Sequence, residues 1–227
     1  MCKGVCGLRM KQILLFDLDG TLTDPGEGIT KSVAYALEKM GHPPLDQKAL
    51  YDFIGPPLVD KFMEVCGFTK DEAMEAVGHF RAYFTPQGIF ENRAYDGIGD
   101  LLRTLQEQGR KLIVTTSKPE PFAVKILKYF DLAQYFDAVV GSTFEETRTY
   151  KWEIIAHFLR LDPGVDPKQM VMIGDRRHDV EGAHRNRIPA IGVSYGYGGR
   201  QELEQAGADW VVDSVEELKE LLLEGTI

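Results

Sequence analysis

The chain has few cysteines, few basic residues and no long apolar run. Its three cysteines among 227 residues argue against a disulfide framework, because the number is both small and odd. No apolar run approaches the roughly 18 residues that a helix needs to cross a bilayer. Lys and Arg number 26 against 35 Asp and Glu, which gives a formal net charge of -9. We therefore expect neither a nucleic acid polymer nor a membrane as partner, since both select for basic surfaces.

The N-terminus carries no targeting pattern that bears on function. Residues 1–9 lack the apolar h-region of a secretory signal, so a cytoplasmic protein is the default expectation. Cys2 and Cys6 could form half of a metal site, but no second pair of Cys or His follows at a suitable spacing. Met10 is well placed for a natural start before the first strand. We expect residues 1–9 to be a disordered leader.

Short apolar runs alternate with segments of helical periodicity over most of the chain. Such runs are typical of strands that are covered by helices on both faces of a parallel sheet. The alternation predicts an α/β fold with a doubly wound parallel sheet and a Rossmann-like core. The predicted strands are residues 12–16, 111–116, 137–140, 170–173, 190–193 and 210–212.

The segment of residues 25–92 interrupts this alternation. Its apolar residues recur at helical spacing, and none of its runs has the pattern of a strand. Ile29, Val33 and Leu37 form one apolar stripe, and Val77 and Phe80 belong to another. We therefore predict an all-helical cap over residues 25–92, inserted into a core that consists of residues 1–24 and 93–227.

Acidic and hydroxyl side chains occur at the ends of three predicted strands, where open α/β sheets bind their ligands. Carboxylates that are packed together repel one another unless a cation lies among them. Mg²⁺ is suited to one or two carboxylates together with a substrate phosphate. The residues at these strand ends are Asp17, Asp19, Thr116, Ser117, Asp175 and Asp179.

Four motifs resemble those of the haloacid dehalogenase superfamily, and the likeness covers nearly the whole chain. The motif D-x-D-G-T begins at Asp17, and Thr116 ends an apolar strand in "LIVTTSKP". The family's lysine corresponds to Lys151 in "RTYKWEII", and its G-D-x-x-x-D motif begins at Gly174. The sequence looks most like the phosphoglycolate phosphatase and 5'-nucleotidase group, which carries a helical C1 cap.

The resemblance implies a role for each of these residues. Asp17 would be the nucleophile that forms an aspartyl-phosphate, and Asp19 would be the general acid and then the general base. The phosphate would be held by Thr116, Ser117 and Lys151. The metal-binding residues would be Asp17, Asp19 through its main-chain carbonyl, Asp175 and Asp179.

Some of these roles have alternatives. Lys118 is a rival to Lys151, and either neighbour of Thr116 could take its place. Asp179 could act without touching the metal, or it could cap the helix that follows it.

The resemblance implies a Mg²⁺-dependent phosphatase, a phosphoric monoester hydrolase acting on small soluble phosphomonoesters of the phosphoglycolate or nucleoside monophosphate type. The acid at Asp19 argues against a dehalogenase, which lacks it in this family. A sugar phosphomutase similar to β-phosphoglucomutase keeps both aspartates and remains an alternative. An inactive binding protein of the same fold is a second alternative. A monomer is the simplest expectation.

The predicted cap contains the stretch "FIGPPL", residues 53–58, which resembles the specificity loop of small helical caps. Nearby aromatic residues could stack on a nucleobase, and nearby cations could hold a small carboxylate, although aromatic residues at helical spacing more often pack a core. The residues concerned are Tyr51, Phe53, Phe84, Phe90, Lys61 and Arg81.

Overall fold

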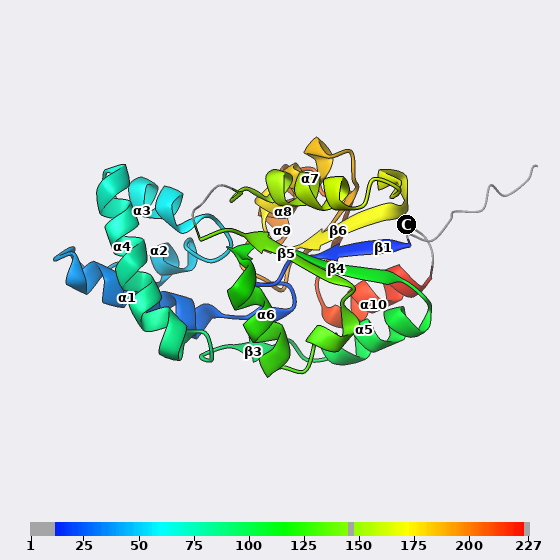
Figure 1. Cartoon of the computed structure of the whole chain (residues 1–227), viewed down its shortest axis with the longest axis horizontal. Helices are drawn as coiled ribbons and strands as arrows, with labels where there is room; N and C mark the ends of the chain where they lie inside the picture. The colour runs from blue at the N-terminus through cyan, green and yellow to red at the C-terminus, as the bar shows by residue number, and fades with distance from the viewer. Residues whose placement is uncertain (1–11, 145–147, 225–227) are drawn as a thin grey trace, which may run out of the picture.

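The computed structural model describes residues 12–144 and 148–224, so the predicted leader lies outside the described residues. Within them, six parallel strands form a sheet in the order β5-β4-β1-β6-β7-β8. This sheet confirms the predicted doubly wound α/β fold (Figure 1). The strands are β1 (Ile13–Phe16), β4 (Lys111–Pro119), β5 (Ala138–Ser142), β6 (Met170–Gly174), β7 (Ala190–Val193) and β8 (Trp210–Val212).

Alternate side chains of the strands point into two apolar layers, because the side-chain period of a strand is two. Leu14 and Phe16 of β1 lie in one layer with α5 (Ile98–Glu107), α6 (Glu120–Tyr129) and α10 (Val215–Leu223). Ile13 and Leu15 lie in the other layer with α7 (Lys151–Leu161), α8 (Arg177–Arg185) and α9 (Gly199–Gln205). Helices therefore cover both faces of the sheet. Two short 3₁₀ helices, η2 (Ala133–Tyr135) and η3 (Pro167–Gln169), lie before β5 and β6.

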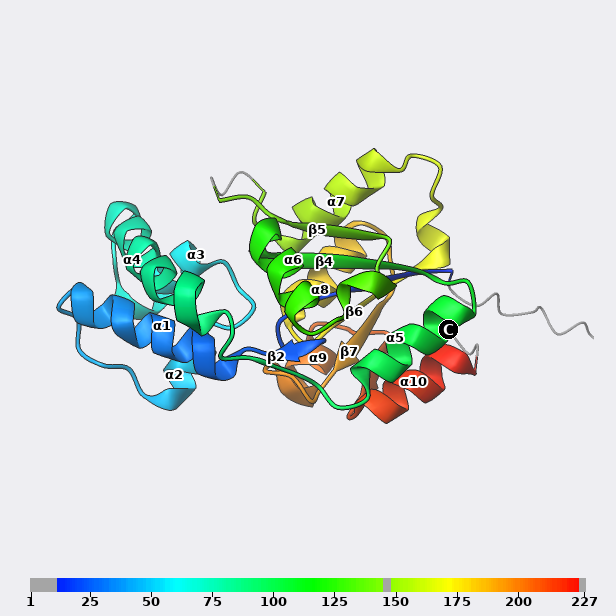
Figure 2. The ribbon, with the colours of Figure 1, turned by 60° about the horizontal axis from the view of Figure 1, so that its bottom comes forward.

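A group of helices stands beside the sheet and covers neither of its faces (Figure 2). We call residues 26–88 the helical insert. Thr69 and Glu72 form a capping box at the start of its helix α4 (Lys70–Tyr83), and the ring centres of Phe53 and Phe62 lie 4.9 Å apart. The insert consists of α1 (Gly26–Lys39), α2 (Gln47–Tyr51), α3 (Leu58–Cys66), α4 (Lys70–Tyr83) and the π-helical turn η1 (Phe84–Gly88).

Two very short strands connect the sheet to the insert. β2 (Thr23–Asp24) pairs antiparallel with β3 (Arg93–Ala94), so the chain enters and leaves the insert along one ladder. The guanidinium of Arg93 and the hydroxyl of Tyr197 both donate hydrogen bonds to Asp24. These contacts hold the β2–β3 ladder against the core.

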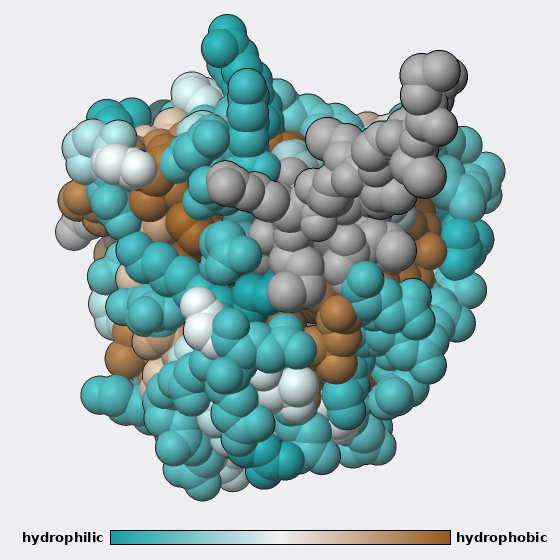
Figure 3. All heavy atoms as spheres, turned by 90° about the vertical axis from the view of Figure 1, so that its right-hand side faces the viewer, coloured by the Kyte–Doolittle hydropathy of each residue, from teal (hydrophilic) through white to brown (hydrophobic). Residues whose placement is uncertain are grey.

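The end of the core that lies away from the insert exposes mainly hydrophilic side chains, with separate apolar patches between them (Figure 3). Among residues 12–144 and 148–224, no helix has both the length and the apolar character to span a membrane.

Candidate active site

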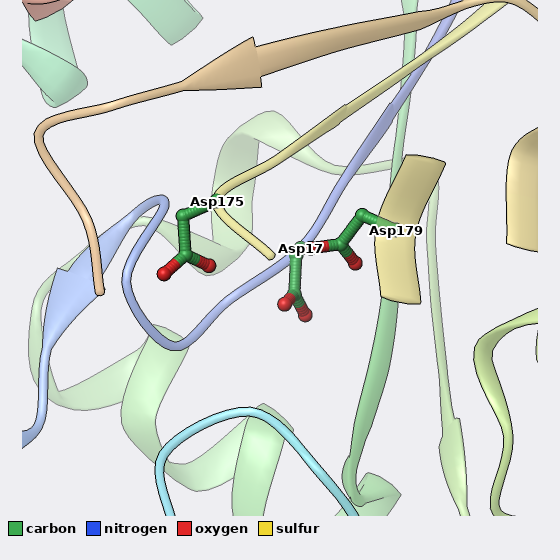
Figure 4. Close-up of side chains that lie close together, drawn as sticks. All are labelled: Asp17, Asp175 and Asp179. Atoms are coloured by element: carbon green, nitrogen blue, oxygen red, sulfur yellow. The ribbon is translucent and has the colours of Figure 1, made fainter. Parts of the chain in front are cut away.

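Three aspartates gather at the carboxyl ends of β1 and β6. Asp17 follows Phe16, whose strand pairs with β6, and its N–H donates to the carbonyl of Ile173 at 2.9 Å. Asp175 follows β6 directly, and Asp179 lies in the first turn of α8. One carboxylate oxygen of each of these aspartates lies within 4.8 Å of the others, and all three side chains are buried. Figure 4 shows the three carboxylates in the space between their elements.

The loop after β1 must pass very close to Asp175. Gly20 has a positive φ of 83°, and a Cβ at this position would lie 2.1 Å from Asp175 Oδ2. A side chain there would be both strained and in collision, so the sequence needs glycine. The N–H of Tyr197 holds the same carboxylate oxygen at 2.8 Å.

Lys151 neutralises part of this acidic cluster. It begins α7, and its Nζ lies 2.8 Å from Asp17 Oδ1 and 2.8 Å from Asp179 Oδ1. It also donates a hydrogen bond to the carbonyl of Thr115 at 2.7 Å. Burial alone would lower the pKa of Lys151, but Asp17 and Asp179 outweigh burial and raise it, so the ammonium stays protonated.

Lys118 occupies a separate position and does not compete with Lys151. Its Nζ lies 2.7 Å from Asp19 Oδ2, with both side chains less than one tenth exposed, and 4.6 Å from the ring centre of Phe84. From the sequence, Lys118 is only a rival to Lys151, and its pairing with Asp19 is not predicted. Its place directly after the Thr-Thr-Ser end of a strand was the available signal.

The buried carboxylates share an excess of negative charge. Burial raises the pKa of Asp175 well above its ordinary value, and Asp179 and Asp17 raise it further. Burial raises the pKa of Asp179 to about 6, against the opposing effect of Lys151. Burial also raises the pKa of Asp19, although Lys118 works in the opposite direction. A cation among these groups would relieve the repulsion.

The two oxygens of Asp179 have different contacts. Oδ1 faces Lys151, and Oδ2 accepts a hydrogen bond from the N–H of Arg176 at 3.0 Å. The second contact is of the kind that caps a helix start, which is one of the roles that the sequence left open for Asp179.

Thr115, Thr116 and Ser117, at the end of β4, have different surroundings. The hydroxyl of Thr115 donates to Met172 Sδ at 3.3 Å and is thus directed into the core. Thr116 accepts a hydrogen bond from the N–H of Lys118 at 3.2 Å, and Ser117 lines a cavity beside Asp19. Thr116 therefore contacts Lys118 and Ser117 lies in the same cavity wall as Asp19, whereas the hydroxyl of Thr115 is engaged elsewhere.

A cavity of about 70 Å³ lies between the helical insert and the core, with Asp19 and Lys118 in its wall. Phe53, Phe84 and Arg81 of the insert also line it. The other candidates for substrate contact are engaged elsewhere, since the ring of Tyr51 packs against Tyr197, the ring of Phe90 packs against Tyr129, and Lys61 pairs with Glu64.

The fold is thus a parallel α/β sheet with buried aspartates that follow its strands, paired with Lys118 at the end of β4 and with Lys151 at the start of α7. The profile described as haloacid dehalogenase-like hydrolase matches residues 14–193. The chain belongs to this family, as its four motifs indicated.

Known proteins with different names resemble the chain over most of its length. A 5'-nucleotidase of Pseudomonas aeruginosa is 48% identical over 190 residues, which cover 84% of this chain and 86% of that protein. A tyrosine-protein kinase of Mycobacterium tuberculosis is 36% identical and covers 93% of this chain and 72% of its own length. The crystal structure of a predicted phosphatase from Clostridium acetobutylicum superposes with a TM-score of 0.91 at 46% identity, over 95% of this chain and 99% of that one.

Proposed function

We propose that this chain is a Mg²⁺-dependent phosphatase that hydrolyses small soluble phosphomonoesters through an aspartyl-phosphate, as a monomer in the cytoplasm. The chain is a phosphoric monoester hydrolase. The observation that carries the proposal is the contact of Lys151 with Asp17 within the cluster of Asp17, Asp175 and Asp179. The family match and the similarity to a 5'-nucleotidase support the same reaction class.

The donor set fits Mg²⁺. Carboxylate oxygens are the ligands that this hard cation prefers, and Asp17, Asp175 and Asp179 bring three of them within 4.8 Å. Burial raises the pKa of Asp175, Asp179 and Asp17 raise it further, and a dication would offset both effects. The main-chain carbonyl of Asp19 would be a further ligand. When bound, the ion would neutralise charge on the phosphate and orient it for displacement.

Asp17 would act as the nucleophile. Because Lys151 contacts Oδ1, the other oxygen, Oδ2, is the one that would form a bond to phosphorus while the bond to the leaving alkoxide breaks. Lys151 would stabilise negative charge on the phosphoryl oxygens, and the hydroxyls of Thr116 and Ser117 would hold the same group.

Asp19 would move the protons. Its raised pKa suits a carboxyl that gives a proton to the leaving alkoxide. Once ionised, Asp19 would take a proton from the water whose oxygen attacks phosphorus, which releases inorganic phosphate and regenerates Asp17. Asp19 Oδ1 has no hydrogen-bond partner among the described residues, so this oxygen is available for the transfer.

The helical insert would serve as the cap, with domain limits at residues 25–92. Closed over the cavity, it would keep bulk water away from Asp17 during the first displacement. Phe53 and Phe84 line the cavity, and aromatic rings there would suit a substrate that carries a planar base, so a nucleoside monophosphate is the first candidate substrate and phosphoglycolate the second.

The test is release of inorganic phosphate from nucleoside monophosphates, phosphoglycolate, sugar phosphates and a generic aryl phosphate, with Mg²⁺ or with chelator. We expect hydrolysis with Mg²⁺ only, and a loss of at least about a thousandfold in Asp17→Asn. Asp100→Asn, at an exposed residue in α5, is the matched control and should keep full activity.

Three results would contradict the proposal. Activity that persists in Asp17→Asn would exclude Asp17 as nucleophile. Phosphate that returns to another position of a sugar, without release, would indicate a phosphomutase. A wild-type protein that binds phosphate esters but hydrolyses none of them would be a binding protein.

A further inference from the structure

Arg176 extends from the acidic cluster to the helical insert. The residue follows Asp175, and its Nη1 donates a hydrogen bond to the carbonyl of Ile54 in the insert at 2.7 Å. Its Nε donates to Glu202 Oε1 of α9 at 3.0 Å, and the Arg176 side chain is 9% exposed. A buried guanidinium therefore joins the core to the loop between α2 and α3.

That loop forms part of the cavity wall. Phe53, Gly55, Pro56 and Pro57 all line the cavity that holds Asp19. Gly55 has a positive φ of 102°, and a Cβ there would lie 3.1 Å from Cγ of Arg176. The loop thus lies directly on the aliphatic part of the arginine, and its backbone conformation presents the carbonyl of Ile54 to the guanidinium.

The main chain of Arg176 contacts the acidic cluster on the other side. Its N–H donates to Asp179 Oδ2 at 3.0 Å. One residue therefore makes hydrogen bonds to a carboxylate of the cluster and to the insert. A shift of the loop that pulls on the guanidinium would also disturb the peptide that orients Asp179.

Glu202 holds the guanidinium in the orientation that this contact needs. Its Oε1 also accepts a hydrogen bond from the N–H of Arg177 at 2.9 Å, so the carboxylate is fixed from two directions. A guanidinium can donate to two acceptors in one rigid plane, whereas the ammonium of lysine is a compact point charge on a flexible stem. The geometry therefore selects arginine at this position.

We propose that Arg176 is a positioning residue that holds the helical insert closed over the cavity and couples this closure to the acidic cluster. The inference rests on the proposed function, because a closed cavity matters only for a reaction inside it. Arg176 touches neither substrate nor reacting atoms in this scheme.

The experiment compares Arg176→Met and Arg176→Lys with wild type and with Arg177→Met. Arg177 is exposed, and its N–H contact to Glu202 survives any side-chain change, so Arg177→Met is the matched control. The first readout is amide hydrogen exchange in metal-free protein. The N–H groups of Phe53 and Ile54 are hydrogen-bonded to carbonyls of α2, so peptides over residues 50–58 report directly on the loop.

We expect exchange over residues 50–58 to rise about tenfold or more in Arg176→Met, the effect expected from losing a hydrogen bond with a charged donor. Exchange in β1 and β6 should be unchanged. The second readout is steady-state hydrolysis of the best phosphomonoester. The ratio kcat/KM should fall about tenfold or more, partial recovery is expected in Arg176→Lys, and Arg177→Met should match wild type.

The two readouts separate the inference from the proposed function. Unchanged exchange over residues 50–58 in Arg176→Met overturns the role of Arg176, whatever the activity. Exchange that rises equally in β1 and β6 also overturns it, because the residue would then support the whole fold. If Arg176→Met does not fold, Arg176→Lys decides, and wild-type exchange in its loop would refute the inference. If the wild type hydrolyses no phosphomonoester, the proposed function is wrong. Amide exchange over residues 50–58 still tests whether Arg176 holds the insert closed.

Discussion

Replacing Asp175 with asparagine should stabilise the metal-free protein at alkaline pH. The change removes one charge and can keep both hydrogen bonds. The amide oxygen can accept from the N–H of Tyr197, as Oδ2 now does at 2.8 Å. The amide nitrogen can donate to the hydroxyl of Thr21, which lies 3.5 Å from Oδ1. The charge is therefore the main difference between the two side chains.

The size of the effect follows from the distances. Oxygens of Asp17, Asp175 and Asp179 lie within 4.8 Å of one another. At this separation and an effective dielectric constant of about 20, two unit charges repel by about 3.5 kcal/mol. Lys151 contacts the other two aspartates, so Asp175 meets both repulsions with little compensation. Protonation of Asp175 in the wild type relieves part of this repulsion. We therefore expect Asp175→Asn to raise the free energy of unfolding by about 2 to 4 kcal/mol.

The stability gained by Asp175→Asn should depend on pH. Burial and the neighbouring aspartates raise the pKa of Asp175 above its ordinary value of 3.8. A carboxyl with a raised pKa contributes its full stability below the unfolded pKa and loses it as the pH rises through the folded pKa. The advantage of Asp175→Asn should therefore be small near pH 4.5 and large at pH 8.

The assay is urea unfolding in chelator at both pH values, with Asp100→Asn as an exposed control that should change stability by less than about 0.5 kcal/mol. Added Mg²⁺ should stabilise wild type more than Asp175→Asn, because a ligand that binds only the folded state shifts the equilibrium toward it. The reasoning is refuted if Asp175→Asn is no more stable than wild type at pH 8 in chelator.

Three further changes test other parts of the site and the insert. Lys118→Met should move the alkaline limb of the kcat/KM profile to higher pH, because burial and Asp17 raise the pKa of Asp19, the proton donor of the first step, and only Lys151 then still lowers it; an unmoved limb would contradict this role. Gly20→Ala should weaken Mg²⁺ binding at least about tenfold in calorimetry, since its Cβ would lie 2.1 Å from a carboxylate oxygen; unchanged affinity would show that the loop can shift freely. Phe62→Ala should destabilise the protein by about 3 to 5 kcal/mol in urea unfolding, because the ring is fully buried in the insert; a loss below about 1 kcal/mol would indicate that the insert repacks.

The core of the fold was predictable because its strands are apolar on both faces. Leu14, Leu15 and Phe16 are completely buried, and such a run at the N-terminus has few other interpretations. Once the strands are parallel, their carboxyl ends must share one edge of the sheet. The proximity of Asp17 and Asp175 follows from this rule, although more than 150 positions separate them in the chain.

Features that depend on short or isolated contacts were not predictable. β2 and β3 have two residues each, too few for any periodic signal. α9 is not predictable because Leu203 is its one fully buried residue, and a single buried position gives no helical periodicity. The pairing of Lys118 with Asp19 depends on the conformation of the chain after β1 and at the end of β4, and the contact of Arg176 with Ile54 depends on how the insert and core meet. Hydrophobic periodicity predicts helices and strands, but it does not predict which side chains meet between them.

The charge balance of the site supports the proposed cation. Four buried aspartates face two buried lysines, which leaves two negative charges in excess when all the groups are ionised. A phosphomonoester dianion that approached Asp17 in this state would be repelled by about 4 kcal/mol for each unit pair at 4 Å. Protons could cancel the excess, but a protonated Asp17 would be no nucleophile. In the proposed mechanism a divalent cation would cancel the excess while Asp17 stays ionised, so attack on phosphorus and metal dependence would have the same electrostatic origin.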